Sequence, residues 1–177
     1  MTLRVTGGEL SGRLLKAPKG IRPSQGMVKE AIFSALAARL EGARVIDLFA
    51  GSGALGIEAL SRGARQVTFV ERDPGAARIL RQNLEATGCL PHASLAVADA
   101  VRWLQANPTA VAGADIVLLD PPYDEPALEA ALHQLDVSAN GVVVAELSSR
   151  RPAPVLERLK ATRDRRYGDA RVVFFQP

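Results

Sequence analysis

Apolar residues along the chain alternate between short continuous runs and longer stretches with helical spacing. The continuous runs are of strand length and predict buried strands at 45–49, 67–70, 95–97, 116–119 and 142–144. Intervals of three and four predict an amphipathic helix that starts near Ser24 and further helices at 54–62, from Pro74 toward Gly88, and at 100–106, 126–135 and 153–160. Strands that are apolar throughout and alternate with helices are typical of an α/β fold with a parallel sheet covered on both faces.

The two ends of the chain depart from this alternation. Near the start, short β-like runs at 3–6 and 13–16 are joined through glycines, which predicts a hairpin or small β extension before the first helix. Near the end, runs at 163–167 and 171–175 are joined at Gly168 and predict an antiparallel hairpin on the edge of the sheet.

The composition is that of an ordinary globular chain of 177 residues and 18.8 kDa, with 47% hydrophobic and 23% charged residues. This length fits a single domain, 1–177, which we divide into an N-terminal extension (1–42) and a core (43–177). The single cysteine, Cys89, excludes an internal disulfide, and two histidines do not supply a zinc site. The longest apolar runs are only of strand length, so we expect a cytoplasmic protein without a metal.

Charge is distributed unevenly along the chain. Residues 1–44 hold 8 Lys and Arg against 3 Asp and Glu, residues 45–144 hold 6 against 12, and residues 145–177 hold 8 against 4. Both ends are therefore basic around an acidic centre, although the formal net charge is only +3. Scattered surface charge would keep a small protein soluble, whereas basic residues gathered on one surface indicate a polyanionic partner.

Four acidic residues stand where four successive predicted strands end: Asp47, Glu71, Asp99 and Asp120. One such residue alone would be explained by capping of the helix that follows. The carboxyl ends of parallel strands meet at the edge where open sheets bind their ligands. All four together therefore predict a binding site at that edge.

Residues 51–56 read Gly-Ser-Gly-Ala-Leu-Gly, a G-x-G-x-x-G motif, and Glu71 follows its first glycine by twenty residues. Such glycines allow a sharp turn from strand to helix, and the carboxylate can accept hydrogen bonds from ribose hydroxyls. A dinucleotide or S-adenosylmethionine would fit this motif. Asp47 favours S-adenosylmethionine, because a carboxylate repels a pyrophosphate but attracts an ammonium and a sulfonium. Asp99 is placed to accept a hydrogen bond from the exocyclic amine of adenine.

The most specific motif is Asp120-Pro121-Pro122-Tyr123, directly after a buried run. The two prolines stiffen the loop and leave its carbonyl oxygens as acceptors. Asp120 and the Pro121 carbonyl can both accept from one planar –NH2 group, which directs the nitrogen lone pair at an electrophilic methyl group. Tyr123 can stack on the base that carries the amine. The motif predicts methyl transfer to an exocyclic amine of a base.

These motifs, together with segments 22–33, 58–64 and 69–71, resemble the RsmD family of bacterial methyltransferases, which modify the N2 amine of a guanine in 16S ribosomal RNA (guanine 966). The resemblance extends over nearly the whole chain. It implies a Rossmann-like class I S-adenosylmethionine-dependent methyltransferase fold with a seven-stranded, mostly parallel sheet. It also implies that the target amine is held by Asp120, Pro121, Pro122 and Tyr123. The cofactor contacts that it implies are Asp47, Phe49, Gly51, Ser52, Gly53, Glu71, Arg72, Asp99 and Ala100.

The partner implied by the resemblance is 16S rRNA within a small-subunit ribosomal particle. Four basic residues of the extension are expected to bind its phosphates: Arg13, Lys16, Lys19 and Arg22. A second basic set could do the same near the carboxyl end: Arg150, Arg151, Arg163, Arg165 and Arg166. The chain departs from the family pattern at 24–27, and at Asp120, where the family often has asparagine.

Other functions remain compatible with parts of this pattern. A DNA adenine-N6 methyltransferase or another amine methyltransferase would use the same Asp-Pro-Pro-Tyr logic, but 177 residues leave no room for a separate DNA-reading module. An NAD-dependent oxidoreductase would explain the glycine motif and Glu71, yet it needs an acid–base residue that His92 and His133 are poorly placed to supply. A non-catalytic RNA-binding assembly factor is disfavoured because both loops are intact.

Overall fold

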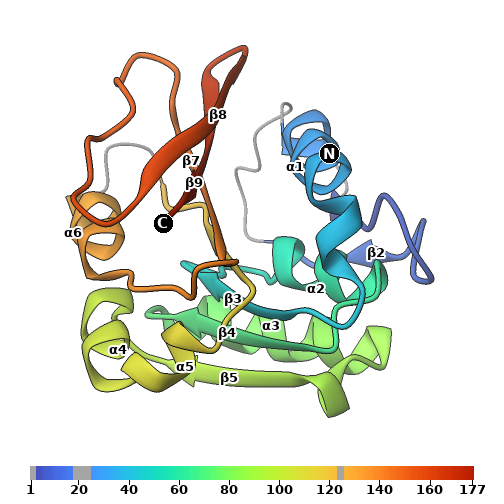
Figure 1. Ribbon diagram of the computed structural model, residues 1–177. Helices are drawn as coiled ribbons and strands as arrows, with labels where there is room; N and C mark the ends of the chain where they lie inside the picture. Colours follow the sequence, from blue (N-terminus) through green and yellow to red (C-terminus); the bar gives the residue numbers. More distant parts are fainter. Residues whose placement is uncertain (1–2, 18–24, 123–125) are drawn as a thin grey trace.

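The computed structural model describes residues 3–17, 25–122 and 126–177, and a seven-stranded sheet forms its centre (Figure 1). The strands are ordered β5-β4-β3-β6-β7-β9-β8. Neighbours from β5 to β7 are parallel, whereas β9 is antiparallel to both β7 and β8. Their bounds are Arg44–Leu48 (β3), Gln66–Glu71 (β4), Ala93–Val97 (β5), Ile116–Leu119 (β6), Val142–Ser148 (β7), Lys160–Tyr167 (β8) and Ala170–Gln176 (β9). The predicted mostly parallel sheet with an antiparallel C-terminal hairpin is confirmed.

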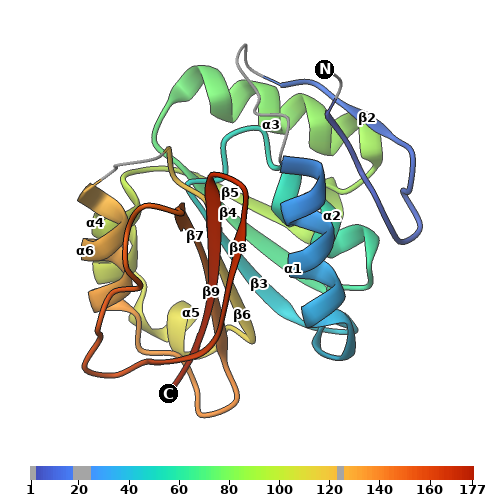
Figure 2. The ribbon, with the colours of Figure 1, turned by 90° about the horizontal axis from the view of Figure 1, so that it is seen from above.

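Helices cover both faces of this sheet, as the view from above shows (Figure 2). One hydrophobic cluster lies under α1 (Gln25–Leu40), α2 (Ala54–Ser61) and α3 (Pro74–Thr87). The other lies under α4 (Ala100–Ala106), α5 (Pro108–Ala112) and α6 (Pro126–Gln134). The 3-10 turn η1 (Leu90–His92) leads into β5. None of the helices that the structure describes combines the length and apolar character needed to cross a membrane.

The boundaries of α3 follow from local chemistry. The Asp73 carboxylate accepts a hydrogen bond from the backbone N–H of Ala76 at 2.6 Å, and Pro74 occupies the first turn, where a missing N–H costs nothing. The helix ends at Gly88, which has a φ of 73° in the left-handed region. Capping residues read from the sequence therefore placed both ends of this helix.

The predicted helix at 153–160 is wrong. The chain is irregular from 149 to 159, and β8 already begins at Lys160, which pairs with Gln176 of β9. Pro154 disfavours helical geometry for the residue before it. Only five residues then remain before the strand, which is too few to offset the cost of starting a helix. The apolar spacing there reflects Leu159, which is buried, and not a helical face, since Val155 is 94% exposed.

The N-terminal extension forms the predicted hairpin, in which β1 (Leu3–Arg4) pairs antiparallel with β2 (Leu14–Leu15). Glu58 in the middle of α2 anchors it. This fully buried carboxylate accepts hydrogen bonds from the backbone N–H groups of Thr6 and Gly7 at 2.8 Å. It also forms ion pairs with Lys29 and Arg62, each at 2.8 Å. Burial raises the pKa of Glu58, but the hydrogen bonds and charges from these partners outweigh it and lower the pKa below 4.5.

We expect Glu58→Gln to reduce the free energy of unfolding by about 3 kcal/mol at pH 7, because it leaves the buried ammonium of Lys29 without its carboxylate. Because the folded-state pKa is lowered, this contribution is complete above the unfolded pKa near 4.5 and is lost as the pH falls through the folded pKa. Urea unfolding of both proteins from pH 7 downward measures it. A difference that stayed constant down to pH 3 would contradict the assignment.

Candidate active site

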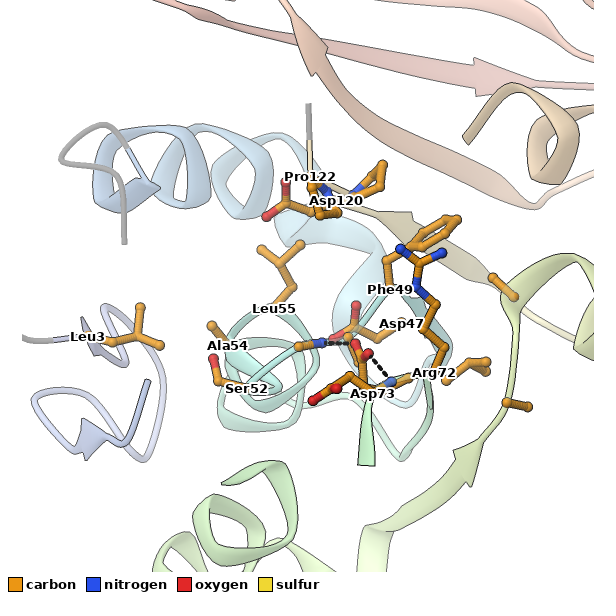
Figure 3. Close-up of a pocket in the computed structure, with 17 residues that line it drawn as sticks. Leu3, Asp47, Phe49, Ser52, Ala54, Leu55, Arg72, Asp73, Asp120 and Pro122 are labelled. Atoms are coloured by element: carbon orange, nitrogen blue, oxygen red, sulfur yellow. Dashed lines mark hydrogen bonds between the residues drawn. The ribbon is translucent and has the colours of Figure 1, made fainter. Parts of the chain in front are cut away.

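A cavity of about 400 Å³ opens at the carboxyl ends of the central strands (Figure 3). The strand order reverses at this point, because β4 lies on one side of β3 and β6 lies on the other. This is the topological switch point at which open α/β sheets bind ligands. Ten of the predicted site residues line the cavity: Asp47, Phe49, Gly51, Ser52, Glu71, Arg72, Ala100, Asp120, Pro121 and Pro122. The fold therefore brings most of the predicted residues to one place.

Asp47 lies at the floor of the cavity, near the end of β3. It is 1% exposed, and its carboxylate accepts a hydrogen bond from the backbone N–H of Gly56 at 2.9 Å. Burial raises the pKa of Asp47 well above its usual value, and the negative charges of Asp120 and Glu71 raise it further, while the bond from Gly56 opposes both. Asp47, Glu71 and Asp120 thus influence one another at this cavity, which Asp73 also lines, and the four carboxyl groups make it favourable for a cation.

Glu71 ends β4 and holds the glycine-rich loop. Its two carboxylate oxygens accept hydrogen bonds from the backbone N–H groups of Gly51 and Asp73, each at 2.7 Å and each drawn as a dashed line in Figure 3. A carboxylate oxygen has two acceptor sites, so both oxygens retain capacity for a further donor. Glu71 is therefore oriented by the backbone before any ligand is bound.

Backbone strain is concentrated in the loop that connects β3 to α2. Phe49 has a φ of 62°, which is uncommon for a residue other than glycine and is typical of functional sites. Gly53 has a φ of 81°, and a Cβ atom there would lie 2.1 Å from Leu80 Cδ1. The second glycine of the motif is thus required both by the turn and by the packing of α3 behind it.

The Asp-Pro-Pro segment enters the same cavity from the end of β6. Asp120, Pro121 and Pro122 line its wall opposite the glycine-rich loop, and Pro121 is buried. Figure 3 shows Asp120 and Pro122 beyond Asp47, with Phe49 and Arg72 on one side. A group bound between this loop and β4 would therefore lie against Asp120, Pro121 and Pro122.

Several predicted residues do not line the cavity or lie outside the described residues. Asp99 caps α4 through a hydrogen bond from the N–H of Arg102 at 3.0 Å, and its neighbours Ala98 and Ala100 line the cavity. Gly53 also does not line the cavity, and it makes the turn from β3 into α2. Three predicted residues lie outside the described part of the chain: Tyr123, Lys19 and Arg22. Arg13 and Lys16 are exposed on the extension, and Lys16 Nζ donates to Gln82 of α3 at 3.0 Å.

Two further residues tie the extension to this site and were not expected from the sequence. Leu3 of β1 lines the cavity. Asn83 of α3 is 2% exposed, exchanges hydrogen bonds with the backbone of Lys16 at 2.8 and 2.9 Å, and donates to the carbonyl of Ser52 at 2.8 Å. The sequence could have indicated Asn83, because helical spacing places this polar residue on the same face as the apolar Leu80 and Leu84. The extension and the glycine-rich loop are thereby held by one buried amide.

Within the described residues, no group of three His, Cys, Asp or Glu side chains is arranged to hold a metal ion. Of the carboxylates at the cavity, Asp47 and Glu71 are oriented by hydrogen bonds from backbone N–H groups. A cavity lined in this way suits an organic ligand that presents several donors and positive charge.

Comparison with known proteins gives consistent matches. Residues 3–176 match the family model described as "Conserved hypothetical protein 95". YlbH of Bacillus subtilis is 39% identical over 181 residues, which cover 98% of each chain. Ribosomal RNA small subunit methyltransferase D of Escherichia coli K12 is 38% identical over 136 residues, which cover 76% of this chain and 67% of that one. A solved structure from Thermus thermophilus is 30% identical with a TM-score of 0.85, covering 98% and 99% of the two chains.

Proposed function

This chain belongs to the RsmD family, the family of the matched model, and we propose that it transfers a methyl group from S-adenosylmethionine to the N2 amine of a guanine in 16S rRNA. The observation that carries the proposal is the meeting of the glycine-rich loop, Glu71 and the Asp-Pro-Pro loop at one cavity. Methyl transfer to ribosomal RNA is supported by the relative from Escherichia coli. More specifically, we propose that the methyl group is transferred to N2 of guanine 966. We also propose that the substrate is the 16S rRNA within a small-subunit particle and that the reaction takes place in the cytoplasm.

The residues of the cavity fit S-adenosylmethionine. The cavity has a volume of about 400 Å³, which is within the range of sites for small ligands. Asp47 and its neighbouring carboxylates favour the ammonium and sulfonium of this cofactor and disfavour a pyrophosphate, which argues against a dinucleotide. Glu71 would accept hydrogen bonds from the ribose, and Phe49, Arg72 and Ala100 would surround the remainder. When bound, S-adenosylmethionine supplies an electrophilic methyl group on sulfur.

The protein's part in the reaction is to position the amine and hold its lone pair toward that methyl group. The exocyclic amine of guanine is a poor nucleophile because its lone pair is delocalised into the ring. With its two hydrogens donated to Asp120 and the Pro121 carbonyl, the nitrogen is oriented, and reaction becomes effectively unimolecular. Asp120 is also the side chain placed to accept the proton that the nitrogen loses.

The test is transfer of labelled methyl from S-adenosylmethionine to RNA and to small-subunit particles taken from cells that lack this protein, followed by digestion to nucleosides. We expect N2-methylguanosine at one site, with particles and naked 16S rRNA compared side by side. N6-methyladenine in DNA or a labelled protein would overturn the substrate and keep the methyl-transfer chemistry. Binding of the cofactor without transfer to any of these would favour the assembly factor.

A further inference from the structure

The edge strand β8 carries basic residues whose orientation is decided by its pairing with β9. Arg163 pairs with Phe174 and Arg165 with Val172, and paired residues of antiparallel strands point to the same face. Phe174 and Val172 belong to the hydrophobic cluster under α1. Arg163 and Arg165 therefore lie on the α1 face of the sheet, and with Tyr167 they form what we call the β8 stripe.

The β8 stripe is open to solvent and oriented by packing. Arg163 and Arg165 are exposed, and Tyr167 is half-buried against the cluster under α1. The Arg163 guanidinium lies 5.7 Å from the centre of the Phe174 ring, a cation–π contact that holds it on this face. In the described part of the chain neither Arg163 nor Arg165 forms an ion pair, so their charge is not neutralised by a carboxylate contact.

The acidic residue of the same strand points to the other face. Asp164 pairs with Val173, which belongs to the cluster under α4 and α6, and its carboxylate binds the guanidinium of Arg171 through two hydrogen bonds. Arg166, which pairs with Arg171, shares that face. On β8 itself, the α1 face therefore carries Arg163 and Arg165 without a carboxylate, and the other face carries Asp164 among arginines. The α1 face of the sheet also holds Glu146 of β7, which pairs with Val172 and is buried, and the Arg165 guanidinium donates a hydrogen bond to the backbone carbonyl of Asp164 at 3.0 Å.

Strand register places the β8 stripe beside the active site. Leu119, the last residue of β6, pairs with Ala145 of β7, and the next residue of β7, Glu146, pairs with Val172 and so lies level with Arg165. Arg165 is therefore level with Asp120, three strands away, or roughly 14 Å at the usual strand spacing. Figures 1 and 2 show the β8–β9 hairpin on one side of this edge and α1 with the extension on the other.

We propose that the β8 stripe binds the sugar-phosphate backbone of the RNA strand that adjoins the target base, with Arg163 and Arg165 on phosphates and the Tyr167 ring against a neighbouring nucleotide. The inference rests on the proposed function, since it supplies a second contact for the same substrate on the side opposite the extension. The competing explanation is that these arginines only protect an exposed edge strand from pairing with other chains.

The experiment compares Arg163→Gln/Arg165→Gln and the single variant Arg165→Gln with Arg166→Gln. The last removes one positive charge, as Arg165→Gln does, but from the opposite face of the same strand, and it is therefore the matched control for the single variant although the sequence alone grouped all three arginines together. Binding of 16S rRNA is measured between 50 and 300 mM salt, together with the KM for RNA at saturating S-adenosylmethionine. We expect the double variant to raise the KM about tenfold or more and to reduce the salt slope of binding by about 0.7 to 0.9 for each phosphate that is no longer bound. The control and the affinity for cofactor should change little.

Two outcomes would overturn the inference. One is a double variant with the KM and salt slope of the wild type, and the other is an equal loss in Arg166→Gln. Arg165→Gln alone keeps the test available if removal of the Arg163–Phe174 interaction unfolds the protein. Binding is measured separately from turnover. A wild-type protein that binds RNA but does not methylate it would therefore refute the proposed function. The β8 stripe would still be tested by comparing the salt slope of RNA binding between the variants and the wild type.

Discussion

Replacing Asp120 with alanine is expected to abolish methyl transfer, with a fall in kcat of about 1,000-fold or more. The variant removes one of two acceptors that orient the amine and the group placed to take its proton, and losses of this size follow when a positioning and proton-accepting group is deleted. The backbone of the loop is kept by Pro121 and Pro122, so the cavity should retain its shape. Single-turnover transfer at saturating cofactor and RNA measures the chemical step directly.

Asp120→Asn is the matched control for this prediction. The amide keeps an acceptor oxygen at the same position but cannot take the proton. We expect it to retain far more activity than Asp120→Ala, while both variants bind S-adenosylmethionine within severalfold of the wild type. Normal turnover in Asp120→Ala would remove Asp120 from the mechanism, and loss of cofactor binding would show that its role lies in the cofactor site.

The second large effect is expected in cofactor binding, where Glu71→Ala should raise the Kd for S-adenosylmethionine about 100-fold or more. The alanine variant loses the acceptor for the ribose and releases the N–H groups of Gly51 and Asp73 from their 2.7 Å bonds. Each hydrogen bond to a charged group contributes roughly 1.5 to 3 kcal/mol, so loss of the two bonds expected from the ribose hydroxyls gives an effect of this size. Calorimetric titration with S-adenosylmethionine measures it.

The kinetic signature distinguishes a binding role for Glu71 from a general loss of structure. In Glu71→Ala the KM for cofactor should rise while kcat at saturating cofactor stays close to that of the wild type. Glu71→Gln keeps one acceptor and should fall between the two. An unchanged Kd in Glu71→Ala would show that the ribose assignment is wrong, and a lowered melting temperature with lost kcat would assign Glu71 to the loop alone.

Most of the fold could be predicted from local pattern. Continuous apolar runs and helical spacing identified the strands and nearly all the helices because those periodicities arise from the geometry of each element. The predicted helix at 153–160 is the exception. Its apolar residues have helical spacing, but the prolines and the pairing of Lys160 with Gln176 decide the local structure.

The site could be predicted where chain direction alone carries the information. Parallel strands end at a common edge, so Asp47, Glu71 and Asp120 were expected to meet, and they line one cavity. Asp99 shares that position in the sequence, and one of its carboxylate oxygens caps α4, a contact that spacing did not predict because it depends on side-chain geometry; its hydrogen bond to adenine stays a prediction.

What the sequence by itself determined about this protein is the order of its elements, its family motifs and the edge at which they meet. What only the tertiary structure decided is which polar residues are buried and which face the basic ones occupy. In the sequence, Glu58 and Asn83 are ordinary polar residues of predicted helices, and only packing of the extension buries them. Arg163 and Arg166 lie on opposite faces of the sheet only because of the register of β8 on β9. Local periodicity sets each element, but burial and orientation depend on segments far away in the chain.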